Sequence, residues 1–201
     1  MALIKSIFAT AIVGALVSPA AAQSVKPDIH RLITPSVIED MRQWIETDIV
    51  RISIGAQNER LKKLSQDKID ALDAQWVAER ESDDKPLIAA TLSNPLSVYL
   101  TRLQGQSLGM YAEIFVMDQN GLNVGQSSIT GDFWQGDEAK FQKTYDVSGD
   151  ALFVDEPEWD DGNKIWRGQV SFTVTDEGES IGAVTMEVNL TELERRTAAG
   201  A

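Results

Sequence analysis

Apolar residues recur at helical spacing through the first half of the chain. After Thr34-Pro35, a pair typical of a helix N-cap and first turn, they run as Val37, Met41, Trp44, Ile45, Ile49, Ile52 and Ala56. Leu61 and Leu64 extend this stripe, which predicts one long helix over residues 35–64. In residues 65–110 the pattern predicts a mixed part of shorter helices, interrupted at residues 82–86 and at Asn94-Pro95.

The second half of the chain changes to the period of a β-sheet. Residues 112–118 (AEIFVMD) form an apolar segment, and the Asn120-Gly121 that follows is a strong hairpin signal. Residues 164–175 alternate between apolar and polar side chains, and a turn leads to a last strand ending at Leu190. Between these segments we expect a short helix within 131–145 and a brief strand at 152–154. Helices followed by antiparallel strands predict an α+β fold, with a sheet of about five strands over residues 112–190.

The two ends of the chain are expected to lie outside this domain. Residues 1–22 combine a basic Lys5, an apolar stretch and Ala20-Ala21-Ala22, which is typical of a cleavable signal peptide. We expect cleavage before Gln23, a tether over residues 23–33, a single domain over residues 34–190, and a C-terminal tail over residues 191–201. The expected product is a periplasmic or secreted protein that is soluble after cleavage, without a membrane span of its own.

Composition and charge exclude several classes of function. The chain has no cysteine, which excludes disulfides, thiolate metal sites and cysteine nucleophiles. Its formal charge of −13 disfavours nucleic acid and anionic lipid as partners. The single histidine, His30, lies in the expected tether, and the sequence contains no serine elbow, phosphate loop or zinc-protease motif. We therefore expect a protein that is not an enzyme and has no cofactor.

Five short motifs resemble one known family. In chain order they are residues 72–76 (LDAQW), 86–88 (PLI), 113–121 (EIFVMDQNG), Phe133-Trp134, and 170–190 (VSFTVTDEGESIGAVTMEVNL). Their order and spacing resemble the extracytoplasmic Cache sensor domains, a PAS-like family found outside bacterial receptors. The resemblance implies a PAS-like sheet packed on a long N-terminal helix.

The resemblance also implies a function. Cache domains usually sit between two membrane spans of a receptor or kinase and bind a small metabolite on one face of the sheet, beneath a lid of loops and a short helix. Here the first apolar segment is expected to be cleaved and no span follows Leu190. We therefore expect a periplasmic sensory domain without its own output module, signalling through a separate membrane receptor or kinase. The alternative is a structural or interaction subunit whose pocket is filled and holds no ligand.

The family pattern assigns candidate ligand contacts. Trp134 matches the lid tryptophan of amino-acid binders, although a core-facing aromatic residue explains it equally well. Those binders hold the ligand's carboxylate with an arginine and a tyrosine, where this chain has Asp132 and Gln135. Glu187 matches the acid that receives the ligand's ammonium, and Glu158 replaces a tyrosine. Asp132, Glu158 and Glu187 together predict a pocket for an amine or other cation.

Arg167 is a basic residue inside the alternating segment of residues 164–175. A three-residue turn in the closing hairpin would place Arg167, Gln169, Glu187 and Asn189 on one polar face, and a slip of one residue would separate them. Arg167 then either contacts the ligand or pairs with Glu187.

Two further expectations concern binding partners. The apolar stripe of the long helix predicts self-association as a homodimer, around Met41 and Trp44. The acidic turn at residues 155–163 offers oxygen ligands for calcium, but its spacing does not match the EF-hand loop, and a solvated loop is the favoured interpretation.

Overall fold

The N-terminal helical stripe forms two helices where the sequence predicts one. The structure, a computed structural model, describes residues 25–200. Helices α2 (Pro35–Ile45) and α3 (Asp48–Leu61) are separated at Glu46 and Thr47, whose backbone angles are not helical. Ile45 and Val50 are both fully buried, yet five residues of a continuous helix would point them about 140° apart. The prediction of one helix over residues 35–64 is therefore wrong, because the break is what brings both stripes to the sheet.

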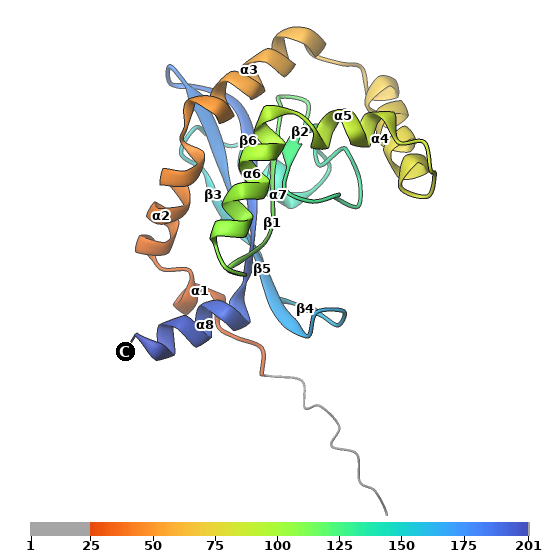
Figure 1. Cartoon of the computed structure of the whole chain (residues 1–201). Helices are drawn as coiled ribbons and strands as arrows, with labels where there is room; N and C mark the ends of the chain where they lie inside the picture. The colour runs from red at the N-terminus through yellow and green to blue at the C-terminus, as the bar shows by residue number, and fades with distance from the viewer. Residues whose placement is uncertain (1–24, 201) are drawn as a thin grey trace, which may run out of the picture.

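The predicted tether and tail are also wrong where the structure describes them. A short helix, α1 (Ile29–Leu32), lies within the tether, and its two end residues are buried. The last strand leads directly into α8 (Leu190–Ala199), which is capped by Asn189 and buries Leu190 and Leu193. Figure 1 shows α1 and α8 side by side at one end of the sheet. Burial of apolar side chains explains why both segments are ordered.

Three more helices complete the helical half. They are α4 (Gln66–Arg80), α5 (Pro86–Leu92) and α6 (Pro95–Gln106). Trp76 of α4 is fully buried and stacks on Phe133 with a centroid distance of 5.2 Å. Its Nε1 donates to the carbonyl of Thr130 at 3.1 Å. Helix α4 thereby holds the loop that follows the first hairpin.

The sheet is antiparallel, which confirms the α+β prediction. Its six strands are β1 (Tyr111–Met117), β2 (Asn123–Gln126), β3 (Leu152–Val154), β4 (Glu158–Asp160), β5 (Ile165–Asp176) and β6 (Glu179–Asn189). The strand order is β2-β1-β6-β5-β3, and β4 pairs with the other end of β5. Strand β4 lies in the segment that was expected to be an acidic turn.

The two faces of the sheet differ in polarity. One face carries Ile114, Val184, Met186, Val170 and Phe172, which form the main core with α2, α3 and α6. The other face carries Glu113, Phe115, Met117, Thr185, Glu187, Arg167, Gln169 and Ser171, since side chains alternate along each strand. The short helix α7 (Ala139–Gln142) covers part of this second face through Phe141, which packs on Phe115 and Met117.

The remaining expectations concern the signal peptide, membrane spans and self-association. The signal peptide predicted for residues 1–22 lies outside the described residues. Within residues 25–200, no helix has the length and apolar character needed to span a membrane. Of the two residues expected to mediate self-association, Met41 is fully buried in the chain's own core and Trp44 is 43% exposed. Self-association through this region stays a prediction, with Trp44 as the accessible residue.

Candidate functional site

The closing hairpin determines which polar side chains share a face. Strands β5 and β6 are joined by a two-residue turn at Glu177-Gly178, and both residues have positive φ, as a type I′ turn requires. The register then shifts next to Val174 and Thr175, where β6 contains one extra residue. Because side chains alternate with period two, this bulge restores the face that a three-residue turn would give. The shared polar face is thus obtained by a different turn.

Arg167 and Glu187 form the centre of this face. Arg167 pairs with Asn189 in the ladder, and Gln169 pairs with Glu187. The Arg167 guanidinium donates through Nη1 to Glu187 Oε2 and lies 3.3 Å from Asp160 Oδ2 through Nε. Gln169 Nε2 reaches the other Glu187 oxygen at 3.4 Å. The Glu187 side chain is only 12% exposed, so its carboxylate has lost most of its contact with water. These hydrogen-bond donors stabilise its negative charge instead.

A small cavity opens beside this pair. It has a volume of about 150 Å³. Its lining residues are Glu138, Asp155, Glu156, Glu158, Arg167, Gly168, Gln169 and Glu187. Three of the five residues proposed from sequence, Glu158, Arg167 and Glu187, are therefore brought together.

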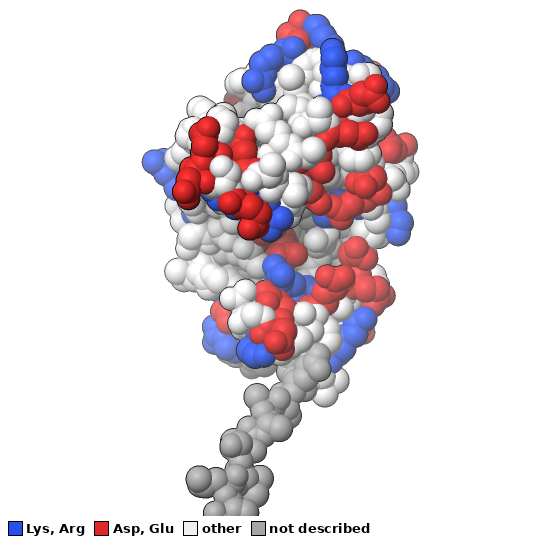
Figure 2. All heavy atoms as spheres, turned by 90° about the vertical axis from the view of Figure 1, so that its right-hand side faces the viewer, with Lys and Arg blue, Asp and Glu red and all other residues white. Residues whose placement is uncertain are grey.

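Carboxylates dominate the charge of this cavity. Glu156 pairs with Lys26 at 2.8 Å, and Glu138 pairs with Lys140 at 2.8 Å. Within residues 25–200, neither Asp155 nor Glu158 has an ion pair. Figure 2 shows acidic side chains predominating on the side of the molecule where β4 lies. The cavity therefore retains negative charge available to a ligand.

Glu113 adds a further carboxyl that the sequence analysis did not select. It lies directly opposite Glu187 on β1 and accepts a hydrogen bond from Ser128 Oγ at 2.7 Å. Burial raises the pKa of Glu113, the neighbouring Glu187 adds to that effect, and the Ser128 hydrogen bond opposes it. In the sequence, Glu113 is the only acidic residue of the apolar segment before Asp118, and this position could have identified it as a candidate.

Lys140 brings a buried positive charge to the same face. Its side chain is 10% exposed, and its ammonium donates to Gln135 Oε1 at 2.9 Å and pairs with Glu138. The ammonium also lies 5.3 Å from the centre of the Phe115 ring, a cation–π arrangement. This part of the sheet face is therefore occupied by a cation that the chain itself supplies.

Asp132 lies near this network but does not line the cavity. Its Oδ1 accepts a hydrogen bond from Gln135 Nε2, and Gln135 in turn accepts from Lys140. Burial raises the pKa of Asp132, with the nearby Glu138 contributing in the same direction. The two residues at the family's carboxylate-clamp positions thus bond to each other, and reach the cavity only through Lys140 and Glu138.

Trp134 also lies away from the cavity. Its indole is half-buried against the cluster of Trp76, Leu122 and Phe133, and Nε1 donates to the carbonyl of Asn120 at 2.9 Å. The ring sits so close to Gly136 that an added Cβ there would lie 2.3 Å from Nε1. These contacts are those of a core-facing aromatic residue.

The acidic turn is held by its own backbone. Asp160 Oδ1 accepts from the amides of Gly162 and Asn163 at 2.9 and 3.1 Å, and Oδ2 accepts from the Asn163 side chain. These hydrogen bonds lower the pKa of Asp160, the Asn163 side chain first. In the part of the chain that the structure describes, no three metal-ligating side chains come together. Asp160 thus orients Arg167 and the turn.

The comparison with known proteins found solved structures that are similar to this chain. No family model and no curated protein matches the sequence. The sensory domain of the Campylobacter jejuni chemoreceptor Tlp3 is 10% identical with a TM-score of 0.41, over 80% of this chain and 65% of that one. The ligand-binding domain of the Pseudomonas aeruginosa PAO1 amino-acid chemoreceptor PctC, in complex with GABA, is 16% identical with a TM-score of 0.37, over 80% and 63%.

A histidine kinase sensor gives a similar result. The sensor domain of V. cholerae DctB is 16% identical with a TM-score of 0.37, over 72% of this chain and 59% of that one. The chain therefore spans less than two thirds of the length of these sensor domains. What this chain binds has to be argued from its own side chains.

Proposed function

We propose that this chain is a small-molecule-binding sensory domain whose ligand is a small organic cation, such as a short amine. The observation that supports this most is the carboxylate-lined cavity beside Glu187 on the polar face of the sheet. Asp155 and Glu158 would attract the ligand, and Glu187 would receive its ammonium. Arg167 and Gln169 keep the Glu187 carboxylate oriented while the site is empty.

The size of the cavity limits the ligand. Its volume of about 150 Å³ is below the range of about 300–1,000 Å³ common for drug-sized ligands. A molecule of a few non-hydrogen atoms fits this volume. A cation with a bulky aromatic group exceeds this volume.

A second function is favoured by a separate observation. Lys140 and Phe141 already cover the middle of the polar face, where Lys140 supplies an ammonium to Glu138 and Gln135. A chain that fills its own pocket in this way would serve as a structural or interaction subunit without a ligand. The two functions differ in whether any small cation binds.

Thermal unfolding in the presence of probes separates them. The probes are butylamine, 1,4-diaminobutane, small amino acids and butyramide. A ligand present at a hundred times its Kd stabilises by about 2.7 kcal/mol, which raises Tm by about 5–10 °C for a domain of this size. We expect this shift with amines and none with butyramide, which has no charge. Equal shifts with butylamine and butyramide would contradict the cation site, and no shift with any probe would favour the structural subunit.

A variant of Glu158 locates the binding. Glu158 is exposed and lines the cavity, so Glu158→Gln should fold normally while reducing the shift caused by amines. The matched control is Glu59→Gln on α3, which removes one surface carboxylate away from the cavity. Equal loss of the shift in both variants would mean that overall charge, and not this cavity, attracts the amines.

Location and signalling partner complete the proposal. The pattern of residues 1–22 supports export to the periplasm with cleavage before Gln23, and we propose a membrane receptor or kinase as the recipient of the signal. N-terminal sequencing of the exported protein should begin at Gln23. Intact Met1 in the membrane fraction would contradict export with cleavage.

A further inference from the structure

A second hollow lies between α2, the connection from α6 to β1, and α8. Its volume of about 470 Å³ is within the range of small-molecule sites. Its lining residues are Asp40, Gln43, Trp44, Leu103, Gln106, Ser107, Leu108, Met110, Tyr111 and Arg196. It shares no residue with the acidic cavity. We call it the α2–α8 groove.

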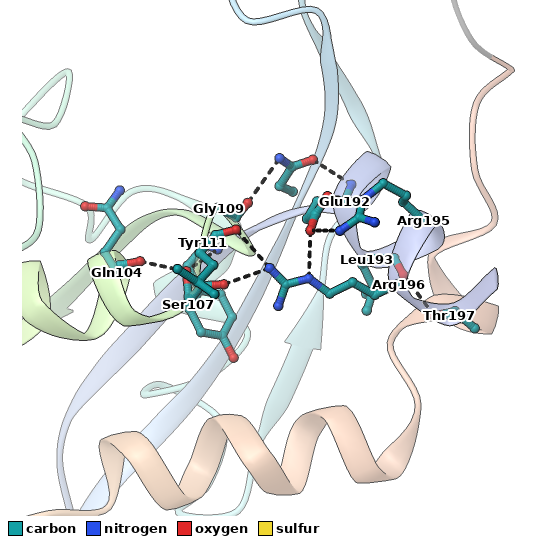
Figure 3. Close-up of polar contacts among 11 residues, drawn as sticks. Gln104, Ser107, Gly109, Tyr111, Glu192, Leu193, Arg195, Arg196 and Thr197 are labelled. Atoms are coloured by element: carbon teal, nitrogen blue, oxygen red, sulfur yellow. Dashed lines mark hydrogen bonds and ion pairs between the residues drawn. The ribbon is translucent and has the colours of Figure 1, made fainter. Parts of the chain in front are cut away.

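One wall of the α2–α8 groove is held in place by α8. Arg196 Nη2 donates to the carbonyls of Ser107 and Leu108, both at 2.9 Å, and Asn189 Nδ2 donates to the carbonyl of Gly109 at 3.1 Å (Figure 3). These bonds fix a turn in which Leu108 has a positive φ of 53° and is 80% exposed. Such a backbone conformation costs free energy for a leucine, so the bonds from α8 maintain an apolar side chain at the mouth of the groove.

Two hydrogen-bond donors remain unused in the groove. The Arg196 guanidinium bonds through Nε to Glu192 and through Nη2 to the two carbonyls, which leaves Nη1 without a partner among residues 25–200. Figure 3 shows this third nitrogen pointing toward the side of Tyr111. The Tyr111 hydroxyl also has no hydrogen-bond partner among the described residues. Burial, and then Asp40, raise the pKa of Tyr111 to about 12, so the hydroxyl stays protonated at neutral pH.

We propose that the α2–α8 groove binds a small monocarboxylate with an apolar body, its carboxylate on Arg196 Nη1 and the Tyr111 hydroxyl. Guanidinium and phenol together match the acceptor geometry of a carboxylate. Trp44, Leu103 and Met110 offer apolar surface to the rest of the ligand. Asp40 on the α2 side repels negative charge near Tyr111, so a dianion should bind more weakly than a monoanion.

Calorimetry with a matched pair of probes tests this site. The probes are 3-phenylpropanoate and its neutral amide, titrated into the full chain. We expect the acid to bind at least tenfold more tightly than the amide. Arg196→Ala should weaken the acid at least tenfold and Tyr111→Phe about three- to tenfold, because each removes a donor to the carboxylate. Trp44→Ala should weaken acid and amide by the same factor, because it removes only apolar contact.

The matched control is Arg195→Ala. Arg195 is the neighbouring arginine on α8 and bonds to the same Glu192, but it does not line the groove. Affinity for the acid should be unchanged in this variant. Tyr111→Phe keeps the ring in place and remains informative if circular dichroism shows that Arg196→Ala is unfolded.

Three results would overturn the proposal. The first is equal affinity for acid and amide, or no saturable binding of the acid at millimolar concentration. The second is an equal loss of affinity in Arg195→Ala and Arg196→Ala. The third is a dimer in sedimentation that Trp44→Ala dissociates and the acid leaves unchanged, which would assign the groove to a second copy of the chain.

Discussion

Glu113 is a half-buried carboxyl placed directly opposite another carboxyl, Glu187, and its ionisation should be visible in the stability of the protein. Its pKa is raised in the folded state, while in the unfolded chain a glutamate titrates near about 4.3. Above that pH the unfolded chain loses its proton first, so the free energy of unfolding falls as pH rises until the folded carboxyl also ionises. Glu113→Gln should remove this fall. Urea unfolding between pH 4 and pH 7 measures it.

Ser128 supplies the control for this prediction. Its hydroxyl bonds to Glu113 and lowers the pKa of that carboxyl, so Ser128→Ala should make the total fall in stability with pH larger and extend it to higher pH. Parallel pH profiles for the wild-type protein and both variants would show that Glu113 carries no such effect.

Trp134 should contribute to stability and not to ligand charge preference. Its indole packs on a buried cluster and bonds to Asn120, so Trp134→Ala should lower the free energy of unfolding by about 2–4 kcal/mol. The affinity of the acidic cavity for amines should be unchanged. A variant that kept its stability but lost amine binding would indicate that Trp134 contacts the ligand, as the family resemblance implies.

The contacts of some side chains can be predicted from the sequence, and those of others cannot. Alternation along residues 164–175 places Arg167 and Gln169 on one face of the sheet and the core residues Val170 and Phe172 on the other face, as in the structure. The role of Lys140 could not be predicted, because its burial depends on how the loop before α7 crosses the sheet. Trp134 was ambiguous for the same reason, since its partners come from α4 and the first hairpin.

Helix α7 is the element that competes with a cationic ligand. Lys140 neutralises Glu138, which lines the acidic cavity, so Lys140→Met should leave the cavity more negative. We expect the affinity for a short amine to rise about three- to tenfold, measured by calorimetry. The control is Lys143→Met, which removes a nearby ammonium that lies over Phe153 and outside the cavity. An equal rise in both variants would mean that only the total charge matters.

The elements that sequence periodicity predicted correctly are those with an uninterrupted pattern. The helical half and the long strands follow the period of their apolar residues. The break between α2 and α3 was missed because Ile45 and Ile49 still fit a helical spacing, although the sheet is contacted by Ile45 and Val50. Helices α1 and α8 are too short, or too polar on their exposed side, to be recognised without the contact between them.

The charge of the whole molecule should also influence binding. With a formal charge of −13, the chain attracts cations from a distance, and salt screens this attraction. Raising the ionic strength from about 0.02 M to about 0.2 M should weaken an amine several-fold, as followed by calorimetry. Affinity that is independent of salt would mean that the amine binds mainly by apolar contact.

The most direct test of the cation site is a titration of the wild-type protein and Glu187→Gln with the amine that stabilises the wild type most. A buried charge-assisted hydrogen bond contributes roughly 1.5–3 kcal/mol, so the variant should bind about ten- to a hundredfold more weakly. Circular dichroism must show that the variant remains folded, since Glu187 also pairs with Arg167. An unchanged affinity in a folded Glu187→Gln variant would contradict the proposed site, and Arg167 would then be tested as an anchor for an anion.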